Sequence, residues 1–460
     1  MGYRLAHSCL ATCAVAMLST PFASSAETPP ELRSSFLVWA NASAHPIAAS
    51  DMDAPTDDLV PIQNMIGRAK IVGLSEGQHG AAEPLVFRNR LFRHLVEHAG
   101  FRAIAIESGV VESRVLNDYV VRGTGEFEAV MRQGFSNGFD TFQQNRELIR
   151  WMRSFNEGKD SDADAIQIYG LDVPGSPGNF DAARRPDTAL ATALQYLHSV
   201  DPEAATDMRA RFEKFLPVLN DVHRYGELKT PERDALTAAV ADLVSLMERE
   251  KHAYVRRSSE EDFDWAQRTA IGARQVDSWF RQMPTGWKLE DGLAWTRRGL
   301  QVRDRSMVDN LQWVLGRLGH GARVLVFGAT GHLASTKVFT PSAPFQESEP
   351  AGIDLRERYG SDFINILNVV ADGEIVYCSS SPRRIMTLKS PPESSATAMF
   401  AAVELPRYAL DLRRAPSVVS AWLHQRHDHW NGFIPSHFET VPAFDLAYVV
   451  HPISSACVAR

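Results

Sequence analysis

The sequence has few cysteines, and it has no long apolar run beyond its first 26 residues. Its 460 residues include four cysteines, and two of them, Cys9 and Cys13, lie in a segment that we expect to be removed. The remaining Cys378 and Cys457 are too few for a disulfide scaffold or a structural zinc cage. This scarcity excludes the small disulfide-rich and zinc-finger classes.

The charge balance excludes a second group of functions. The chain has 48 Lys and Arg residues against 56 Asp and Glu residues, a formal net charge of −8, and no polybasic run. Because basic patches attract nucleic acids and anionic membranes, we expect neither as a partner. A hydrophobic content of 44% with 23% charged residues is typical of a globular protein. The length allows about three domains, or one domain with a large insertion.

Residues 1–26 are predicted to be a secretory signal peptide. Arg4 and His7 give a basic start, SCLATCAVAML is a short apolar stretch, and the small residues SSA precede Glu27. The stretch is too short to span a membrane, and no later segment reaches about 18 apolar residues. We therefore expect a periplasmic or secreted protein without a membrane segment. A lipoprotein signal ending at Cys13 is the alternative, less favoured because Cys13 falls inside the apolar stretch.

Four short apolar runs indicate an α/β fold. Runs rich in β-branched residues that do not alternate with polar residues are typical of strands buried on both faces. The runs are KIVGL (70–74), FRAIAIE (101–107), IQIYGLD (166–172) and ARVLVFG (322–328). A helical pattern over 84–99 ends at Gly100 and completes a βαβ unit. We predict a mostly parallel central sheet flanked by helices.

The domain boundaries follow from where the strand signal stops. Residues 184–318 show helical spacing alone and are predicted to form a helical insertion lobe. The α/β core then has a first part, 27–183, and a second part, 319–460. In the second part we expect a hairpin, FINILNVV and EIVYCS around Asp372-Gly373, and a last strand, FDLAYVVH (444–451), at the sheet edge.

Polar side chains follow each of the four apolar runs. The carboxyl ends of parallel strands meet at one edge of a sheet, where α/β proteins bind ligands. The candidate residues at these ends are Glu76, His79, Glu107, Asp172 and His332. A neutral histidine can take a proton from water, and a carboxylate can hold its other ring nitrogen. We expect His79 and Glu107 to form such a pair.

Three arginines are candidate cations for the same edge. Arg88 and Arg90 lie on the helix after the first run, and Arg303 lies in QVRDRSMVDN. A guanidinium group held at the site would stabilise an oxyanion. We assign Arg303 and Asp172 to substrate binding.

The stretch VGLSEGQHGAAEPLVFRNRLFRHLVEHAGFRAIAIES resembles the opening of the erythromycin esterase-like family. RDRSMVDNLQWVL resembles that family's Arg-Asp-x-x-Met-x-x-Asn helix, and FETVPAFDLAYVVH its closing strand, so the resemblance runs from about 60 to 455. It implies a hydrolase without metal or cofactor that opens a small-molecule ester or macrolactone with water. The matching residues are Glu76, His79 as base, Arg88, Glu107 and His332. Ala329 stands where the family usually has the first of two histidines.

Other interpretations use the same residues. Gly73 to Gly77 also matches G-x-S-x-G, and the order Ser75, Asp172, His332 fits a serine hydrolase triad. A zinc or manganese ion on Glu76, His79, Glu107 and His332 is a second alternative. A periplasmic binding protein that has lost catalysis is a third. The histidine cluster at 424–429 is interpreted as a solvated helix end, with metal capture as its alternative. The sequence does not predict an oligomeric state.

Overall fold

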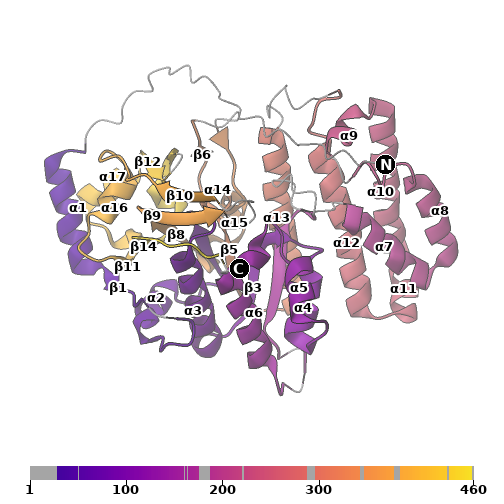
Figure 1. Cartoon of the computed structure of the whole chain (residues 1–460), viewed down its shortest axis with the longest axis horizontal. Helices are drawn as coiled ribbons and strands as arrows, with labels where there is room; N and C mark the ends of the chain where they lie inside the picture. Colours follow the sequence, from indigo (N-terminus) through magenta and orange to yellow (C-terminus); the bar gives the residue numbers. More distant parts are fainter. Residues whose placement is uncertain are drawn as a thin grey trace, which may run out of the picture.

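A computed structural model of the chain describes residues 28–457 (Figure 1), except 50, 160, 163, 176–186, 220–221, 287–295, 342–346, 378–383 and 433–434. The predicted signal peptide therefore lies outside the described residues. Within them, no helix has both the length and the apolar character that a membrane span requires.

The core is an eight-stranded sheet in the order β1-β11-β14-β8-β2-β5-β3-β4. Neighbouring strands from β14 to β4 are parallel, whereas β11 and β1 are antiparallel at one edge. The strands are β1 His45–Pro46, β2 Ile71–Glu76, β3 Phe101–Gly109, β4 Gln167–Asp172, β5 Arg323–Ala329, β8 Phe363–Val370, β11 Arg407–Asp411 and β14 Leu446–Val450. The mostly parallel α/β sheet that the sequence predicts is thus confirmed.

The four apolar runs form β2, β3, β4 and β5, four adjacent strands of the sheet. Every residue of β2 is buried, as expected of a strand covered on both faces. Helix α3, Ala82–Ala99, connects β2 to β3 and ends at Gly100, whose φ of 68° is left-handed. Helices α4 Ser113–Arg122, α5 Phe127–Gly134 and α6 Gln143–Asn156 follow β3.

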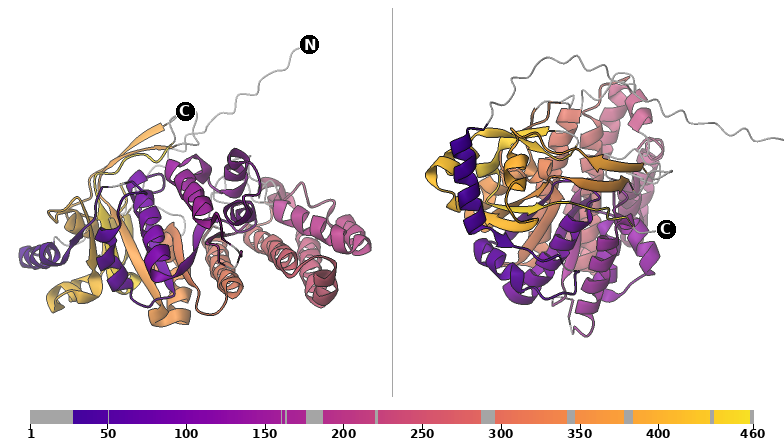
Figure 2. Two further views of the ribbon diagram at one scale, coloured as in Figure 1. Left: turned by 90° about the horizontal axis from the view of Figure 1, so that it is seen from below. Right: turned by 60° about the vertical axis from the view of Figure 1, so that its left-hand side comes forward.

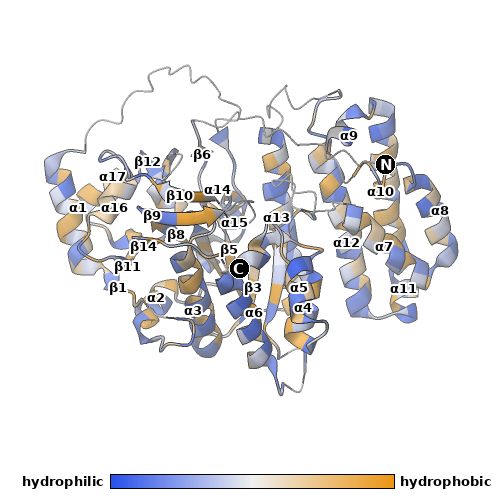
Figure 3. Ribbon diagram, viewed as in Figure 1, coloured by the Kyte–Doolittle hydropathy of each residue, from blue (hydrophilic) through white to orange (hydrophobic). Residues whose placement is uncertain are grey.

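Between β4 and β5, the described residues form helices alone. They are α7 Asp187–Val200, α8 Pro202–Phe212, α9 Val222–Glu227, α10 Thr230–Arg249, α11 Lys251–Arg257, α12 Glu260–Phe280 and α13 Thr296–Leu318. Helices α7 to α12 lie together at one end of the molecule (Figures 1 and 2). Their buried apolar residues form one core cluster that includes Leu190, Leu243 and Phe280, and both hydrophobic and hydrophilic residues occur along these helices (Figure 3). Helix α13 connects this lobe with β4.

Two predictions about the second part of the core are wrong. β14 does not lie at the sheet edge, because it pairs with β8 on one side and β11 on the other. β8 and β9, Gly373–Tyr377, do not form a hairpin around Asp372-Gly373. β9 instead pairs with β10, Arg384–Leu388, in a separate antiparallel ribbon. The Pro/Ser-rich composition of residues 380–396 concealed β10.

A third, four-stranded sheet has the order β12-β13-β6-β7, with β6 Val338–Phe339, β7 Glu347–Ser348, β12 Arg426–Trp430 and β13 Pro435–Glu439. The interpretation of 424–429 as a helix end is wrong beyond His424. α17 stops at Leu423, and the later histidines belong to β12. The remaining α-helices are α1 Pro30–Ser43, α2 Val60–Ile66, α14 Thr330–Leu333, α15 Ala351–Tyr359, α16 Ala396–Ala401, α17 Ser417–Leu423 and α18 Thr440–Ala443.

Candidate active site

The carboxyl ends of β2, β5, β3 and β4 carry a cluster of charged side chains. Glu76 ends β2, Glu107 lies near the end of β3, and Asp172 ends β4. His332 lies in the short helix α14 directly after β5, and Arg303 reaches the cluster from α13. The structure therefore brings together the acidic and histidine residues that the sequence places at strand ends.

His79 is paired with Glu76. It lies in the turn between β2 and α3, three residues beyond Glu76, and its Nδ1 is 2.7 Å from Glu76 Oε2. The Glu76 side chain is 3% exposed, whereas that of His79 is 42% exposed. A buried carboxylate thus orients a histidine that substrate can reach. The expected pairing of His79 with Glu107 is wrong, because the turn folds the ring back onto its own strand end.

The charge of Glu76 sets the protonation of His79. Desolvation alone would lower the pKa of His79, but the charge and hydrogen bond of Glu76, assisted by Glu107, raise this pKa to about 9. His79 is therefore an imidazolium at neutral pH in the free protein. It becomes a neutral base as the pH rises through about 9.

Glu107 and Asp172 share the guanidinium group of Arg303. Arg303 donates to both oxygens of Asp172, at 2.8 and 2.6 Å, and to Glu107 Oε1 at 2.7 Å. The Asp172 side chain is fully buried. Burial alone would raise the pKa of Glu107, but the charges of His332 and Arg303 hold it well below its usual range. Glu107 is thus fixed as an anion, and it shares the guanidinium group of Arg303 with the buried side chain of Asp172.

His332 lies between two carboxylates. Its Nδ1 is 2.7 Å from Asp304 Oδ1, and its Nε2 is 3.4 Å from Glu107 Oε1. Burial would lower the pKa of His332, but Asp304 and Glu107 raise it to about 10. Asp304 was missed as a candidate residue, although it follows Arg303 in the quoted motif. Consecutive helical residues point in different directions, so Asp304 reaches His332 while Arg303 reaches the strand ends.

Replacing Asp304 with asparagine is expected to lower the pKa of His332 clearly below about 10, because the charge that favours the imidazolium is lost. NMR titration of the histidine ring protons measures this change. Asp309→Asn is the matched control, because Asp309 lies on the same helix and pairs with Arg268. An unchanged pKa of His332 in Asp304→Asn would contradict the pairing described above.

The two candidate arginines on α3, Arg88 and Arg90, have different surroundings. Arg88 is buried, donates to Asn89 and Asn145, and lies 4.8 Å from the centre of the Phe327 ring. Burial lowers the pKa of Arg88 to about 10, opposed by the charge of Glu76. Arg90 instead forms an ion pair with Asp58, at 2.7 Å. Arg88 thus belongs to the cluster, whereas the expectation that Arg90 faces the same edge is wrong.

A cavity of about 200 Å³ opens beside Glu76 and His79. Another part of its wall comes from α16, β12 and β13, which the sequence analysis did not connect with the site. That wall contains Thr397, His429, Trp430, Asn431, Ser436 and Phe438. His429 stacks on Phe438 at 3.8 Å, and burial lowers its pKa to about 3. The cavity therefore has a charged wall and a neutral wall that is mainly polar.

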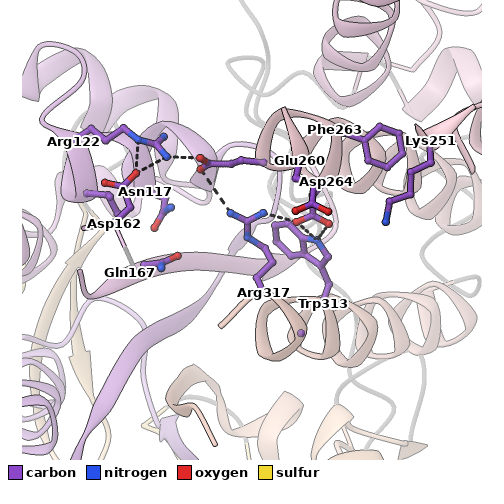
Figure 4. Close-up of a pocket in the computed structure, with 13 residues that line it drawn as sticks. Asn117, Arg122, Asp162, Gln167, Lys251, Glu260, Phe263, Asp264, Trp313 and Arg317 are labelled. Atoms are coloured by element: carbon purple, nitrogen blue, oxygen red, sulfur yellow. Dashed lines mark hydrogen bonds and ion pairs between the residues drawn. The ribbon is translucent and has the colours of Figure 1, made fainter. Parts of the chain in front are cut away.

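A second cavity, of about 570 Å³, lies at the start of β4, away from the charged strand ends (Figure 4). Five of its charged residues, from α4, α12, α13 and the loop before β4, form ion pairs with one another. Arg122 pairs with Asp162 and Glu261, and Arg317 pairs with Glu261 and Asp264. These pairs connect the helical lobe with the sheet region, and no candidate residue lines this cavity.

The surroundings of Ser75 do not fit a nucleophile. Ser75 is fully buried inside β2, and the strand continues through it to Glu76. Its Oγ accepts hydrogen bonds from Asn368 N–H at 2.9 Å and from Thr330 Oγ at 3.1 Å. A nucleophile elbow requires an exposed serine at a sharp turn. The serine hydrolase alternative is therefore wrong.

The side chains of the alternative metal site already have other partners. Arg303 occupies the position between Glu107 and Asp172, and both nitrogens of His332 already face carboxylates. Across the described part of the chain, no three His, Cys, Asp or Glu side chains converge as metal ligands. These acidic, arginine and histidine side chains therefore pair with one another, as in an ion-pair cluster, and not as ligands of a metal ion.

The profile of the family described as "Erythromycin esterase" matches residues 96–441. The chain is 22% identical over 333 residues to "Erythromycin esterase type II" of Escherichia coli, covering 72% of this chain and 76% of that protein. It is 23% identical over 289 residues to "Erythromycin esterase type I" of Escherichia coli, covering 60% of this chain and 65% of that protein.

Two solved structures share the fold. A protein from Bacillus cereus superposes with a TM-score of 0.76 at 23% identity, covering 93% of this chain and 99% of that one. A mutant of erythromycin esterase EreC in its open conformation superposes with a TM-score of 0.66 at 18% identity, covering 90% of this chain and 98% of that one.

Proposed function

Because this chain belongs to the erythromycin esterase family, we propose that it is an exported hydrolase that cleaves an ester or lactone by His79-assisted attack of water. The observation that carries this proposal is the 2.7 Å pair of Glu76 and the half-exposed His79 beside a cavity. A buried carboxylate on one ring nitrogen leaves Nε2 to accept a proton from water. The same carboxylate stabilises the resulting imidazolium.

The reaction consumes one water molecule. Its oxygen bonds to the carbonyl carbon while a proton passes to His79 Nε2, and the bond to the alcohol oxygen then breaks. The imidazolium returns the proton to the departing alkoxide, which leaves an acid and an alcohol, or an opened ring for a lactone. Buried Arg88, whose charge acts on Glu76, is a fixed cation that favours negative charge at this strand end.

The size of the cavity bears on the substrate. Drug-sized ligands occupy pockets of about 300 to 1,000 Å³, whereas the cavity beside His79 measures about 200 Å³. We expect a small ester to fit inside, and a macrolactone to insert only its ester group and neighbouring atoms.

The proposal is tested by mass spectrometry of purified protein incubated with erythromycin and a panel of simpler lactones and esters, with and without chelator. We expect a gain of one water on at least one substrate, unaffected by chelator. Absence of turnover on the whole panel by a folded protein would favour a binding protein instead. Turnover lost with chelator and restored by added metal would favour the metal-dependent alternative.

Ser75→Ala is expected to retain activity but to lower stability. The variant leaves the buried Asn368 N–H without its hydrogen-bond acceptor, which costs about 1 to 3 kcal/mol. Thermal unfolding and turnover, measured on the same preparation, separate the two effects. A stable but inactive Ser75→Ala protein would contradict the assignment of His79 as base and restore the serine hydrolase alternative.

A disulfide supports the proposed export. Cys457 is disulfide-bonded, and such bonds persist mainly in oxidising compartments such as the periplasm. Expressed in a bacterium with two membranes, the protein is expected in the periplasmic fraction with Glu27 as its first residue. Alkylation without reductant should leave Cys457 unlabelled. Recovery from the cytoplasm with Met1 retained and Cys457 reduced would contradict export.

A further inference from the structure

The segment Ile453–Cys457, here called the strap, bonds to the turn that carries His79. Ala456 N–H donates to Gly80 O at 2.8 Å, and Ala82 N–H donates to Ser454 O at 2.8 Å. Within the turn itself, the Ala81 N–H to Gln78 O bond is longer, at 3.4 Å. The shorter backbone bonds on both sides of Ala81 are thus supplied by the strap.

A side-chain contact reinforces this attachment. Glu83, in the first turn of α3, accepts two hydrogen bonds from Ser454, one from its N–H and one from its Oγ, each at 2.7 Å. These are charge-assisted bonds, which are stronger than neutral ones. The strap therefore fixes the point where the turn enters α3.

On its other side, the strap lies against β9. Glu374 N–H donates to Ile453 O at 3.1 Å, and Ile453 N–H donates to Asp372 O at 3.0 Å. A Cβ at Gly373 would lie 2.2 Å from Ile453 O, and the φ of Gly373 is 129°. Glycine is needed here because the backbone of the strap crosses that of Gly373 directly. This close crossing explains the Asp372-Gly373 pair, which the sequence analysis interpreted as a hairpin turn.

The strap also reaches the aromatic residues beside His79. Gln143 N–H donates to Ala456 O at 2.9 Å, and Phe142 forms an isolated bridge with Cys457. The Phe142 ring lies 5.4 Å from that of Phe139, which in turn lies 5.5 Å from His79. Cys457 is also disulfide-bonded. Both the backbone of the turn and the wall beside His79 thus depend on the strap.

We propose that the strap is a positioning element that holds the His79 turn so that the imidazole stays against Glu76. This inference rests on the proposed function, in which His79 is the base. The strap does not touch the imidazole itself in the contacts described above. It acts through Gly80, Ala82 and Glu83, and Ser454 and Gly373 are the residues that keep it in place.

The charged groups that act on His79 are Glu76, Glu107 and Arg303. Gly373→Ala and Ser454→Ala change none of these charges. A pKa change of His79 in either variant therefore reports on the distance between His79 and Glu76. Loosening the turn weakens this ion pair, so the pKa of His79 falls from about 9 towards its ordinary value.

The experiment is an NMR titration of histidine-labelled protein, in which a His79→Gln sample identifies the His79 resonance. We expect the midpoint to fall by about one pH unit in Gly373→Ala and by less in Ser454→Ala. On a substrate of the wild type, and measured above about pH 9, where His79 is unprotonated in both proteins, kcat should fall about tenfold in Gly373→Ala with KM changed less than twofold.

Thr387→Ala is the matched control, because it removes a hydrogen bond to Glu374 within the same β9–β10 ribbon without touching the strap. If Gly373→Ala does not fold, the titration midpoint of His79 in Ser454→Ala tests the inference. Folded variants that keep the wild-type midpoint of His79 would overturn the inference. Because the titration needs no substrate, it tests the role of the strap even if the protein hydrolyses no substrate. Absence of turnover would contradict the proposed function but not the positioning of His79 by the strap.

Discussion

Replacing His79 with glutamine is expected to lower kcat/KM by about 10²- to 10⁴-fold, the usual contribution of a general base. Glutamine can still donate a hydrogen bond to Glu76, but it cannot accept a proton from water at any pH between 5 and 10. Because the Glu76 side chain is 3% exposed and loses the imidazolium charge, some loss of stability should accompany the loss of activity. Steady-state kinetics and thermal unfolding of the same sample measure both quantities.

His424→Gln is the control for this experiment. His424 lies at the exposed end of α17, where its Nδ1 contacts Ser420 O, and it takes no part in the cavity. We expect wild-type kinetics from it. A His79→Gln protein with the wild-type kcat/KM on the same substrate would refute the role of His79 as base.

Arg303→Met is expected to have the largest effect on stability. It leaves Glu107 and Asp172 buried without their shared cation. Breaking a buried ion pair by removing one partner costs about 3 to 5 kcal/mol, because the remaining charge is uncompensated. The thermal unfolding temperature should fall markedly, and the fall should be smaller at acidic pH, where Glu107, whose pKa Arg303 no longer lowers, can become protonated.

Arg211→Met provides the comparison. Arg211 pairs with Asp242 at 2.6 Å, but both side chains are well exposed, and such surface pairs contribute about 0 to 1 kcal/mol. Equal losses of stability in the two variants would mean that Arg303 does not compensate buried charge.

The strands of the core could be predicted because burial leaves a clear pattern. β2 to β5 are covered by helices on both faces, so their sequences read as continuous apolar runs. The position of β14 could not be predicted in the same way. Strand order depends on long-range pairing, and the sequence near 444–451 does not identify β8 and β11 as its neighbours.

The residues of the site were easier to predict than their partners. Parallel strands deliver their carboxyl ends to one edge, which identifies Glu76, Glu107 and Asp172 as neighbours. Which carboxylate contacts His79 depends on the conformation of the five-residue turn 77–81. In the structure, this turn places the imidazole against Glu76. The neutral cavity wall was missed because it comes from β12 and β13, far away in the sequence.

The most direct test of the account is the pH dependence of kcat/KM for the wild type and for Glu76→Gln. This profile reports the ionisation of the free enzyme, and a base is active only when unprotonated. Activity of the wild type should therefore rise with pH and level off above about 9, the pKa of His79. Without the Glu76 charge the midpoint should move to lower pH. A wild-type profile that stays flat between pH 6 and 10, or that is unchanged in Glu76→Gln, would contradict a His79 base controlled by Glu76.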